Sequence, residues 1–128
     1  MYYNNDYILR QIELLGKGVR VMLGKQEAGD EEEMIAEDGR LSGEIFLLHR
    51  LRALLYEGRV NEAENLLFEN LERQMNPAYF ATAVTFYSEV QRLSDGELAE
   101  AGFSRAEIAE GLADVRRLYD AWRANTKA

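Results

Sequence analysis

The chain contains few side chains whose type and spacing could support catalysis. His49 is its only histidine, and it has no cysteine. A carboxylate-bridged di-iron site in a helical bundle requires paired Glu-x-x-His motifs on separate helices, and the sequence has none. The lack of cysteine excludes disulfides, thiol catalysis and cysteine-ligated metal sites. We therefore predict no catalytic residue, no cofactor and no metal ligand.

The motifs of nucleophilic, nucleotide and calcium sites are also missing. A serine triad would have to combine His49 with one of four serines, and three of these, Ser42, Ser94 and Ser104, are predicted helix caps. No glycine-rich loop follows a strand, as phosphate binding requires. The acidic segment that ends at Asp38-Gly39 lacks the ligand offsets of an EF-hand.

Charge is distributed unevenly along the chain. The formal net charge is −8, and seven acids without a base lie between Glu27 and Asp38, which leaves 16 of the 23 acids to balance 15 bases elsewhere. We interpret residues 26–41 as an exposed acidic linker. The alternative is an acidic docking strip, with Glu31, Glu32 and Glu33 at its centre, for a basic partner or for the basic face of the first helix.

Neither nucleic acid nor a membrane is an expected partner. The C-terminal helix carries a basic cluster, but acids on the same helix partly cancel it: Arg116, Arg117, Arg123 and Lys127 against Glu110, Asp114 and Asp120. No run of about 18 apolar residues occurs, and the start MYYNNDY has no basic segment, so we expect no membrane span and no signal peptide.

A helical hairpin over residues 42–75 forms the predicted centre of the fold. Apolar residues at spacings of three and four mark the buried face of its first helix: Ile45, Leu48, Leu51 and Leu55. Gly58 ends this helix. Asn61 is the predicted N-cap of the second helix, in a capping box with Glu64. The second helix is expected to bury Ala63, Leu66, Leu67 and Leu71.

Residues 5–24 are predicted to form the first helix. Its apolar stripe consists of Ile8, Ile12, Leu15, Val19 and Met22. Gly16 and Gly18 each weaken an isolated helix by roughly 1 kcal/mol relative to alanine, so this helix requires tertiary packing. It is expected to pack on the core or to form an oligomer contact, which makes a homodimer through the first helix possible.

Residues 76–124 are predicted to form a second helical hairpin. Asn76 and Pro77 begin its first helix, whose aromatic residues include Tyr79, Phe86 and Tyr87. If these tyrosines are buried, their hydroxyls must find partners. Capping boxes are predicted at Ser94 with Glu97 and at Ser104 with Glu107, and Gly102 closes the short helix between them. The last helix carries a stripe of Ile108, Leu112, Val115, Tyr119 and Trp122.

The sum of these elements is an all-α fold. No stretch alternates apolar and polar residues with β-branched enrichment. We predict a single domain over residues 1–128, built as a small helical bundle of stacked antiparallel hairpins.

Two resemblances accompany this prediction. Gly58, Glu62-Ala63 and Leu66-Leu67 resemble the middle of a tetratricopeptide repeat, although Leu51 and Asn70 replace two of its small residues. The segments NDYILRQIELLGK, EGRVNEAENLLFENL and FSRAEIAEGLADVRRLYD, in that order, resemble an uncharacterised family of small all-helical bacterial proteins. These resemblances imply a tetratricopeptide-like hairpin in a helical, cytoplasmic, bacterial protein, and they imply no activity.

The function expected from the sequence alone is a non-catalytic module for protein–protein interaction or self-association. Its contact surface on the central hairpin is predicted at Arg52 with His49 and Tyr56. The alternative is a small-molecule-binding protein or an enzyme with a pocket beside the aromatic helix at Tyr79, Phe86 and Tyr87.

Overall fold

The computed structural model describes residues 5–26, 43–73 and 75–126, and these residues form helices without any strand. The helices are α1 (Asn5–Gln26), α2 (Gly43–Tyr56), α3 (Val60–Arg73), α4 (Pro77–Gln91), α5 (Asp95–Glu100) and α6 (Arg105–Thr126). The predicted all-α fold is confirmed. The first and last helices each extend two residues beyond their predicted ends.

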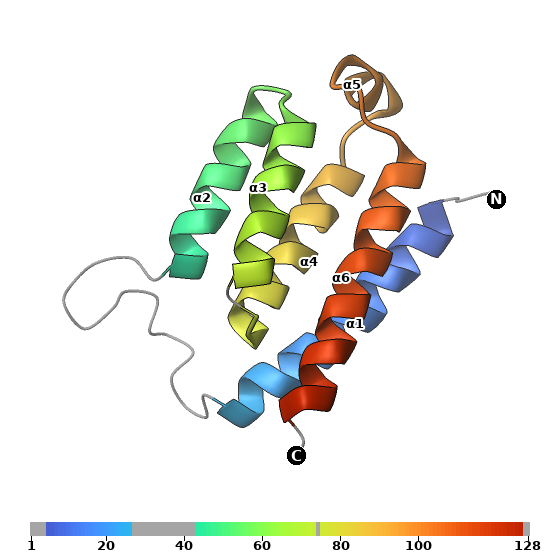
Figure 1. The fold of residues 1–128 in the computed structure, drawn as a ribbon. Helices are drawn as coiled ribbons and strands as arrows, with labels where there is room; N and C mark the ends of the chain where they lie inside the picture. The colour runs from blue at the N-terminus through green and yellow to red at the C-terminus, as the bar shows by residue number, and fades with distance from the viewer. Residues whose placement is uncertain (1–4, 27–42, 74, 127–128) are drawn as a thin grey trace.

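Helix α4 is the centre of the bundle. It packs against α1, α2, α3 and α6, and Figure 1 shows α2 and α3 on one side of it and α6 with α1 on the other. Its rings explain this position, because Phe80, Phe86 and Tyr87 are fully buried. Aromatic side chains bury more area than any others, so the helix that carries them takes the middle of the core.

Helices α2 and α3 form the predicted antiparallel hairpin (Figure 1). Gly58 has φ +77° at the turn, and the backbone N–H groups of Gly58 and Arg59 donate to the carbonyls of Leu55 and Leu54, each at 2.9 Å. This is the Schellman arrangement that a glycine after a helix permits. The prediction that Gly58 ends the helix is confirmed.

The buried face of α2 differs from the predicted one. Leu47 and Leu51 are buried, whereas Ile45, Leu48 and Leu55 are only half-buried. Apolar residues occur on several sides of α2, so spacing alone did not identify the side that faces α3 and α4. In α3 the buried residues are Val60, Ala63, Leu67 and Leu71.

The predicted capping box between Asn61 and Glu64 is wrong. Helix α3 begins at Val60, and the N–H of Ala63 already donates to the carbonyl of Arg59 at 3.0 Å. Because α3 begins one residue before the predicted cap, the Val60 side chain belongs to the helix and is fully buried in the core. The Asn61 side chain instead donates to the carbonyl of Gly102 at 3.2 Å, and Glu64 accepts from Tyr87.

The predictions for the other helix ends have mixed outcomes. Ser104 accepts from the N–H of Glu107, but the Glu107 carboxylate accepts from the Ser104 hydroxyl, so the predicted reciprocal capping box is not formed there. The predicted cap Ser42 lies outside the described residues.

Two predicted caps and a helix-ending glycine are confirmed. Asn76 accepts from the N–H of Tyr79, and Ser94 forms a reciprocal capping box with Glu97. Gly102 has φ +71° after α5. An unpredicted contact joins the next helix to α4, since the Arg105 guanidinium donates to the carbonyls of Gln91 and Leu93, each at 2.8 Å. The Gln91 carbonyl is one that the end of α4 leaves without an intrahelical partner, and Leu93 lies in the link that follows.

Helix α1 packs against α4 and α6. Its buried residues are Ile8, Leu15 and Val19, and the predicted Met22 lies among those side chains that the structure does not describe. A Cβ at Gly16 would lie 3.5 Å from the Val84 side chain, and one at Gly18 would lie 3.4 Å from the Tyr119 hydroxyl. Both glycines therefore face neighbouring helices, as a packed first helix requires.

Candidate interaction surface

A row of exposed residues runs along α2 on the side away from the core. The row consists of Phe46, His49, Ala53 and Tyr56, at spacings of three, four and three, and we call it the outer α2 stripe. Phe46 is 55% exposed and Tyr56 is 93% exposed. This spacing places the four side chains along one line on a helix. It is the spacing with which one helix meets another.

The inner side of α2 is already used by the fold. Leu47 and Leu51 are buried, and in the described part of the chain α2 contacts only α3 and α4. An amphipathic helix at the edge of a bundle normally has one apolar side. Helix α2 has a second row that includes two exposed aromatic rings.

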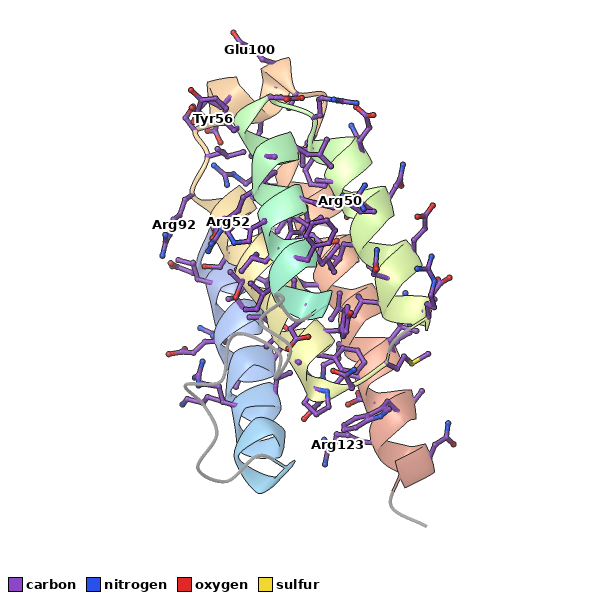
Figure 2. All side chains as sticks on the ribbon, turned by 90° about the vertical axis from the view of Figure 1, so that its left-hand side faces the viewer. Arg50, Arg52, Tyr56, Arg92, Glu100 and Arg123 are labelled. Carbon is purple, nitrogen blue, oxygen red and sulfur yellow. The ribbon has the colours of Figure 1, made fainter. Side chains whose placement is uncertain are left out.

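Arginines lie on both sides of the outer α2 stripe. At about 100° per residue, Arg50 and Arg52 fall on opposite sides of this line. Figure 2 shows Arg50, Arg52, Arg92 and Tyr56 on the face that α2 presents. Neither Arg50 nor Arg92 forms an ion pair with another residue of the described ranges.

Arg52 connects α2 to α4. Its Nε and Nη2 donate to the Oε2 of Glu89 at 2.9 and 2.6 Å. These hydrogen bonds, with the charge of Glu89, raise the pKa of Arg52, so the guanidinium stays charged. The Arg52 side chain is 50% exposed, and part of it therefore remains accessible beside the stripe.

A cleft of about 370 Å³ adjoins Tyr56 at the end of the stripe. It lies between the turn after α2 and helix α5, with an apolar floor that includes Leu55, Leu93 and Ala101. Three acids border it: Glu57, Glu97 and Glu100. The charge along this face therefore changes from basic near Arg50 to acidic near Tyr56.

A second cleft, of about 390 Å³, separates α3 from α6 and is acidic. Its lining includes Glu64, Glu72, Glu107, Glu110 and Asp114. The buried Tyr87 hydroxyl donates to Glu64 at 2.5 Å. Burial raises the pKa of Glu64, and the charges of Glu107 and Glu110 raise it further, against the lowering effect of the Tyr87 hydrogen bond. Burial also raises the pKa of Tyr87, so its hydroxyl remains a donor.

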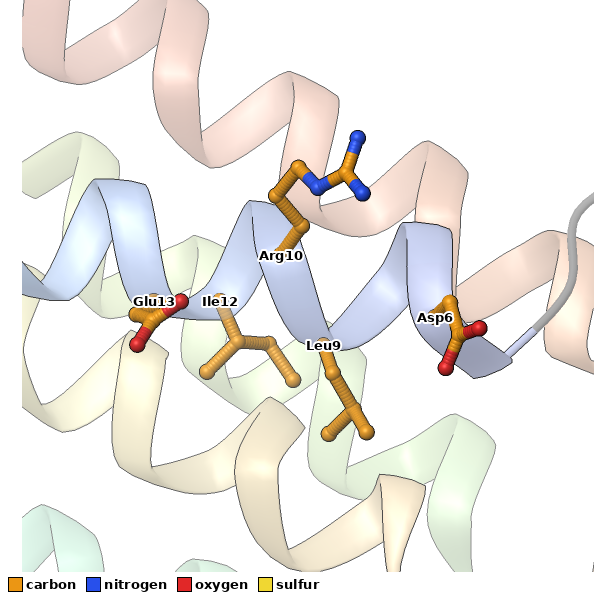
Figure 3. A pocket seen from close by; sticks show the side chains of 5 residues that line it. All are labelled: Asp6, Leu9, Arg10, Ile12 and Glu13. Carbon is orange, nitrogen blue, oxygen red and sulfur yellow. The ribbon is translucent and has the colours of Figure 1, made fainter.

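A shallow depression on α1 is the third concave feature. Its volume is about 450 Å³, and the described residues that line it all belong to α1: Asp6, Leu9, Arg10, Ile12 and Glu13. Figure 3 shows Leu9 and Ile12 on one side of the helix and Arg10 on the other. Among the described residues a single helix supplies the lining, so they provide no opposing wall that could hold a small ligand.

Neither a metal cluster nor a membrane span was found in the structure as described. No group of three or more histidine, aspartate and glutamate side chains could hold a metal ion there. None of the helices in these residues is long and apolar enough to cross a bilayer. The rings of Tyr79, Phe86 and Tyr87 are buried in the core, and none of the three clefts above is lined by them.

Comparison with protein-family models gives a match that covers nearly the whole chain. The model of a family of unknown function, DUF6483, matches residues 2–120. The chain belongs to this family. The resemblance to an uncharacterised helical family is thereby confirmed. No curated protein and no solved structure matches the DUF6483 chain, so its likeness to a tetratricopeptide repeat stays a prediction.

Three of the contact residues predicted for this DUF6483 protein lie on the outer side of α2. His49 and Tyr56 belong to the outer α2 stripe, and Arg52 lies beside it in its ion pair with Glu89. Glu31, Glu32 and Glu33 lie outside the described residues. Phe46 and Ala53 were not predicted as contact residues, because apolar residues occur on several sides of α2 and spacing alone does not show which side is exposed.

Proposed function

We propose that this DUF6483 protein is a non-catalytic, cytoplasmic protein–protein interaction module. Its contact surface is the outer α2 stripe, and its partner is another protein that lays a helix along Phe46, His49, Ala53 and Tyr56. The observation that carries the proposal is the second row on α2, in which the rings of Phe46 and Tyr56 are 55% and 93% exposed although the opposite side of the helix is buried.

The energetics of the exposed rings support this proposal. Full burial of a large apolar side chain stabilises a complex by about 1.5 to 3 kcal/mol relative to exposure. Phe46 and Tyr56 lie near the two ends of the stripe, and aromatic residues are enriched among the residues that dominate binding energy. Between them Ala53 is small, so a partner helix can approach the α2 backbone closely.

A homodimer through α1, which the sequence allows, would have a weaker surface. Three residues of the apolar stripe of α1 are buried in the same chain, where α1 packs against α4 and α6: Ile8, Leu15 and Val19. Its exposed apolar residues include Leu9 and Leu14, which are 52% and 50% exposed. Five positions on a helix correspond to a rotation of about 140°, so these two leucines do not share one face. We therefore favour α2 over α1.

Photo-cross-linking in cells of the source organism tests the proposal. A photoreactive phenylalanine analogue replaces Ala53 in the stripe or, as a control, the exposed Ala113 of α6. We expect a discrete product with another protein from position 53 alone, which competition with the unmodified protein reduces. Equal products from both positions, or none from position 53, would contradict the proposed surface.

A further inference from the structure

We infer that the helix that docks on the outer α2 stripe is amphipathic and acidic, with carboxylates on both sides of its apolar row. This inference rests on the proposed function and names the chemistry of the partner. Arginines border the stripe, with Arg50 on one side and Arg52 and Arg92 on the other (Figure 2).

Among the described residues, the positive charge on this face is only partly balanced by acids. Arg52 is paired with Glu89, whereas Arg50 and Arg92 have no ion-pair partner in the described ranges. A helix that lies on Phe46 and Ala53 brings its own flanking residues next to these guanidinium groups. Carboxylates at those flanks gain bidentate hydrogen bonds, and lysines there are repelled.

The acidic end of the face sets the direction of the docked helix. Glu57, Glu97 and Glu100 surround the cleft beside Tyr56. The N-terminus of a helix carries a partial positive charge, and its C-terminus carries a partial negative charge. The partner helix therefore has its N-terminus over Tyr56 and runs antiparallel to α2.

A second copy of this chain does not fit the same surface. A two-fold axis brings residues near it against their own symmetry mates. An antiparallel overlap that sets Phe46 against Tyr56 of the other copy centres on Leu51. It would place Arg50 near its own mate, and Arg52 as well. Repulsion between these arginines selects against self-association and for an acidic partner.

Two designed peptides test the inference in purified full-length protein. Both have about three heptads with leucine at the a and d positions. One carries glutamate at the flanking positions and the other carries lysine. Fluorescence anisotropy measures their affinities at low and moderate salt. We expect the glutamate peptide to bind about tenfold more tightly or better, with a preference that falls as salt rises.

Charge reversal shows which residues set the preference. The double variant R50E/R92E is expected to lose the preference for the glutamate peptide. R116E/R117E changes the net charge equally at two exposed positions of α6 and is expected to keep it. A preference that survives R50E/R92E, or one that R116E/R117E also removes, would overturn the inference.

The remaining outcomes separate this inference from the proposed function. If both peptides bind equally and the F46S/Y56S variant binds neither, the stripe is a docking surface and the acidic class of partner is wrong. If neither peptide binds, or if F46S/Y56S binds both as before, both statements fail. Sedimentation of the protein alone tests self-association. A dimer that is present in the wild type and absent in F46S/Y56S would overturn the inference of an acidic partner in favour of a second copy of this chain.

Discussion

The hydroxyl of Tyr87 donates a 2.5 Å hydrogen bond to the carboxylate of Glu64, and this contact joins α4 to α3 beside α6. Tyr87 is fully buried, and Glu64 is half-buried at the edge of the acidic cleft. A hydrogen bond to a carboxylate is shorter and stronger than one between neutral groups. The contact therefore links α4 to the α2–α3 hairpin that carries the outer α2 stripe.

Replacement of Tyr87 by phenylalanine should destabilise the protein. It removes the donor and leaves the Glu64 carboxylate without its protein partner, at a cost of about 1 to 2 kcal/mol because water reaches the exposed part of Glu64. Urea unfolding measures this difference. Y56F is the matched control, since Tyr56 is 93% exposed, and its effect should stay within about 0.5 kcal/mol.

The raised pKa of Glu64 gives a pH dependence with a definite sign. The folded protein binds the Glu64 proton more tightly than the unfolded chain, whose carboxyl has its ordinary pKa of 4.5. Stability contributed by this group is therefore fully present below pH 4.5 and is lost as pH rises through the raised pKa. The E64Q variant has no carboxyl at this position to titrate. As pH rises through the raised pKa of Glu64, E64Q should therefore gain stability relative to the wild type.

Glu62 provides a control with the opposite sign. Hydrogen bonds from Arg59 lower its pKa in the folded protein, so its contribution is present above pH 4.5 and is lost as pH falls through the lowered pKa. E62Q should therefore become less stable relative to the wild type as pH rises. Urea unfolding measures both variants from below the lowered pKa of Glu62 to above the raised pKa of Glu64. If the stability of both variants relative to the wild type changed with pH in the same direction, the assigned shifts would be contradicted.

Alanine at position 111 should destabilise the fold although it favours helix formation. A Cβ on Gly111 would overlap the Tyr87 hydroxyl and press on the Glu64 carboxylate. Overpacking of this kind costs about 1 to 3 kcal/mol. G96A is the control, because the nearest atom to a Cβ there is 3.9 Å away. Thermal unfolding that shows equal effects at both positions would contradict the close contact.

The ion pair of Arg52 with Glu89 should contribute modestly. The two side chains are 50% and 24% exposed, so solvent screens their attraction. A double-mutant cycle with R52Q and E89Q should give a coupling of about 0.2 to 1 kcal/mol that decreases with salt. A coupling of zero at low salt would show that the pair does not hold α2 against α4.

The sequence predicted those features that depend on neighbours in the chain. Gly58 and Gly102 have the positive φ angles of helix ends, and Asn76 and Ser94 cap helices as predicted. Features that depend on distant contacts were not predictable. Asn61 and Glu64 have capping-box spacing. The Asn61 side chain instead donates to Gly102, 41 positions away, and the Glu64 carboxylate accepts from Tyr87, 23 positions away.

The residues of the proposed contact surface were predicted only in part, for the same reason. His49, Arg52 and Tyr56 were predicted as contact residues because Arg52 occupies a position that would line the inner face of a tetratricopeptide groove, with His49 and Tyr56 as its neighbours. Phe46 was missed because α2 carries apolar residues on several sides, and only packing against α3 and α4 decides which side is buried. Tertiary contacts thus separated the inner leucines from the outer stripe.

The most direct test of the central claim compares stability and cross-linking in one variant, F46S/Y56S. Both side chains are exposed, so the free energy of unfolding should change by less than about 1 kcal/mol. The cross-linked product formed from position 53 should disappear in the same variant. Unchanged cross-linking in a stable F46S/Y56S protein would contradict the claim that the outer α2 stripe is the contact surface.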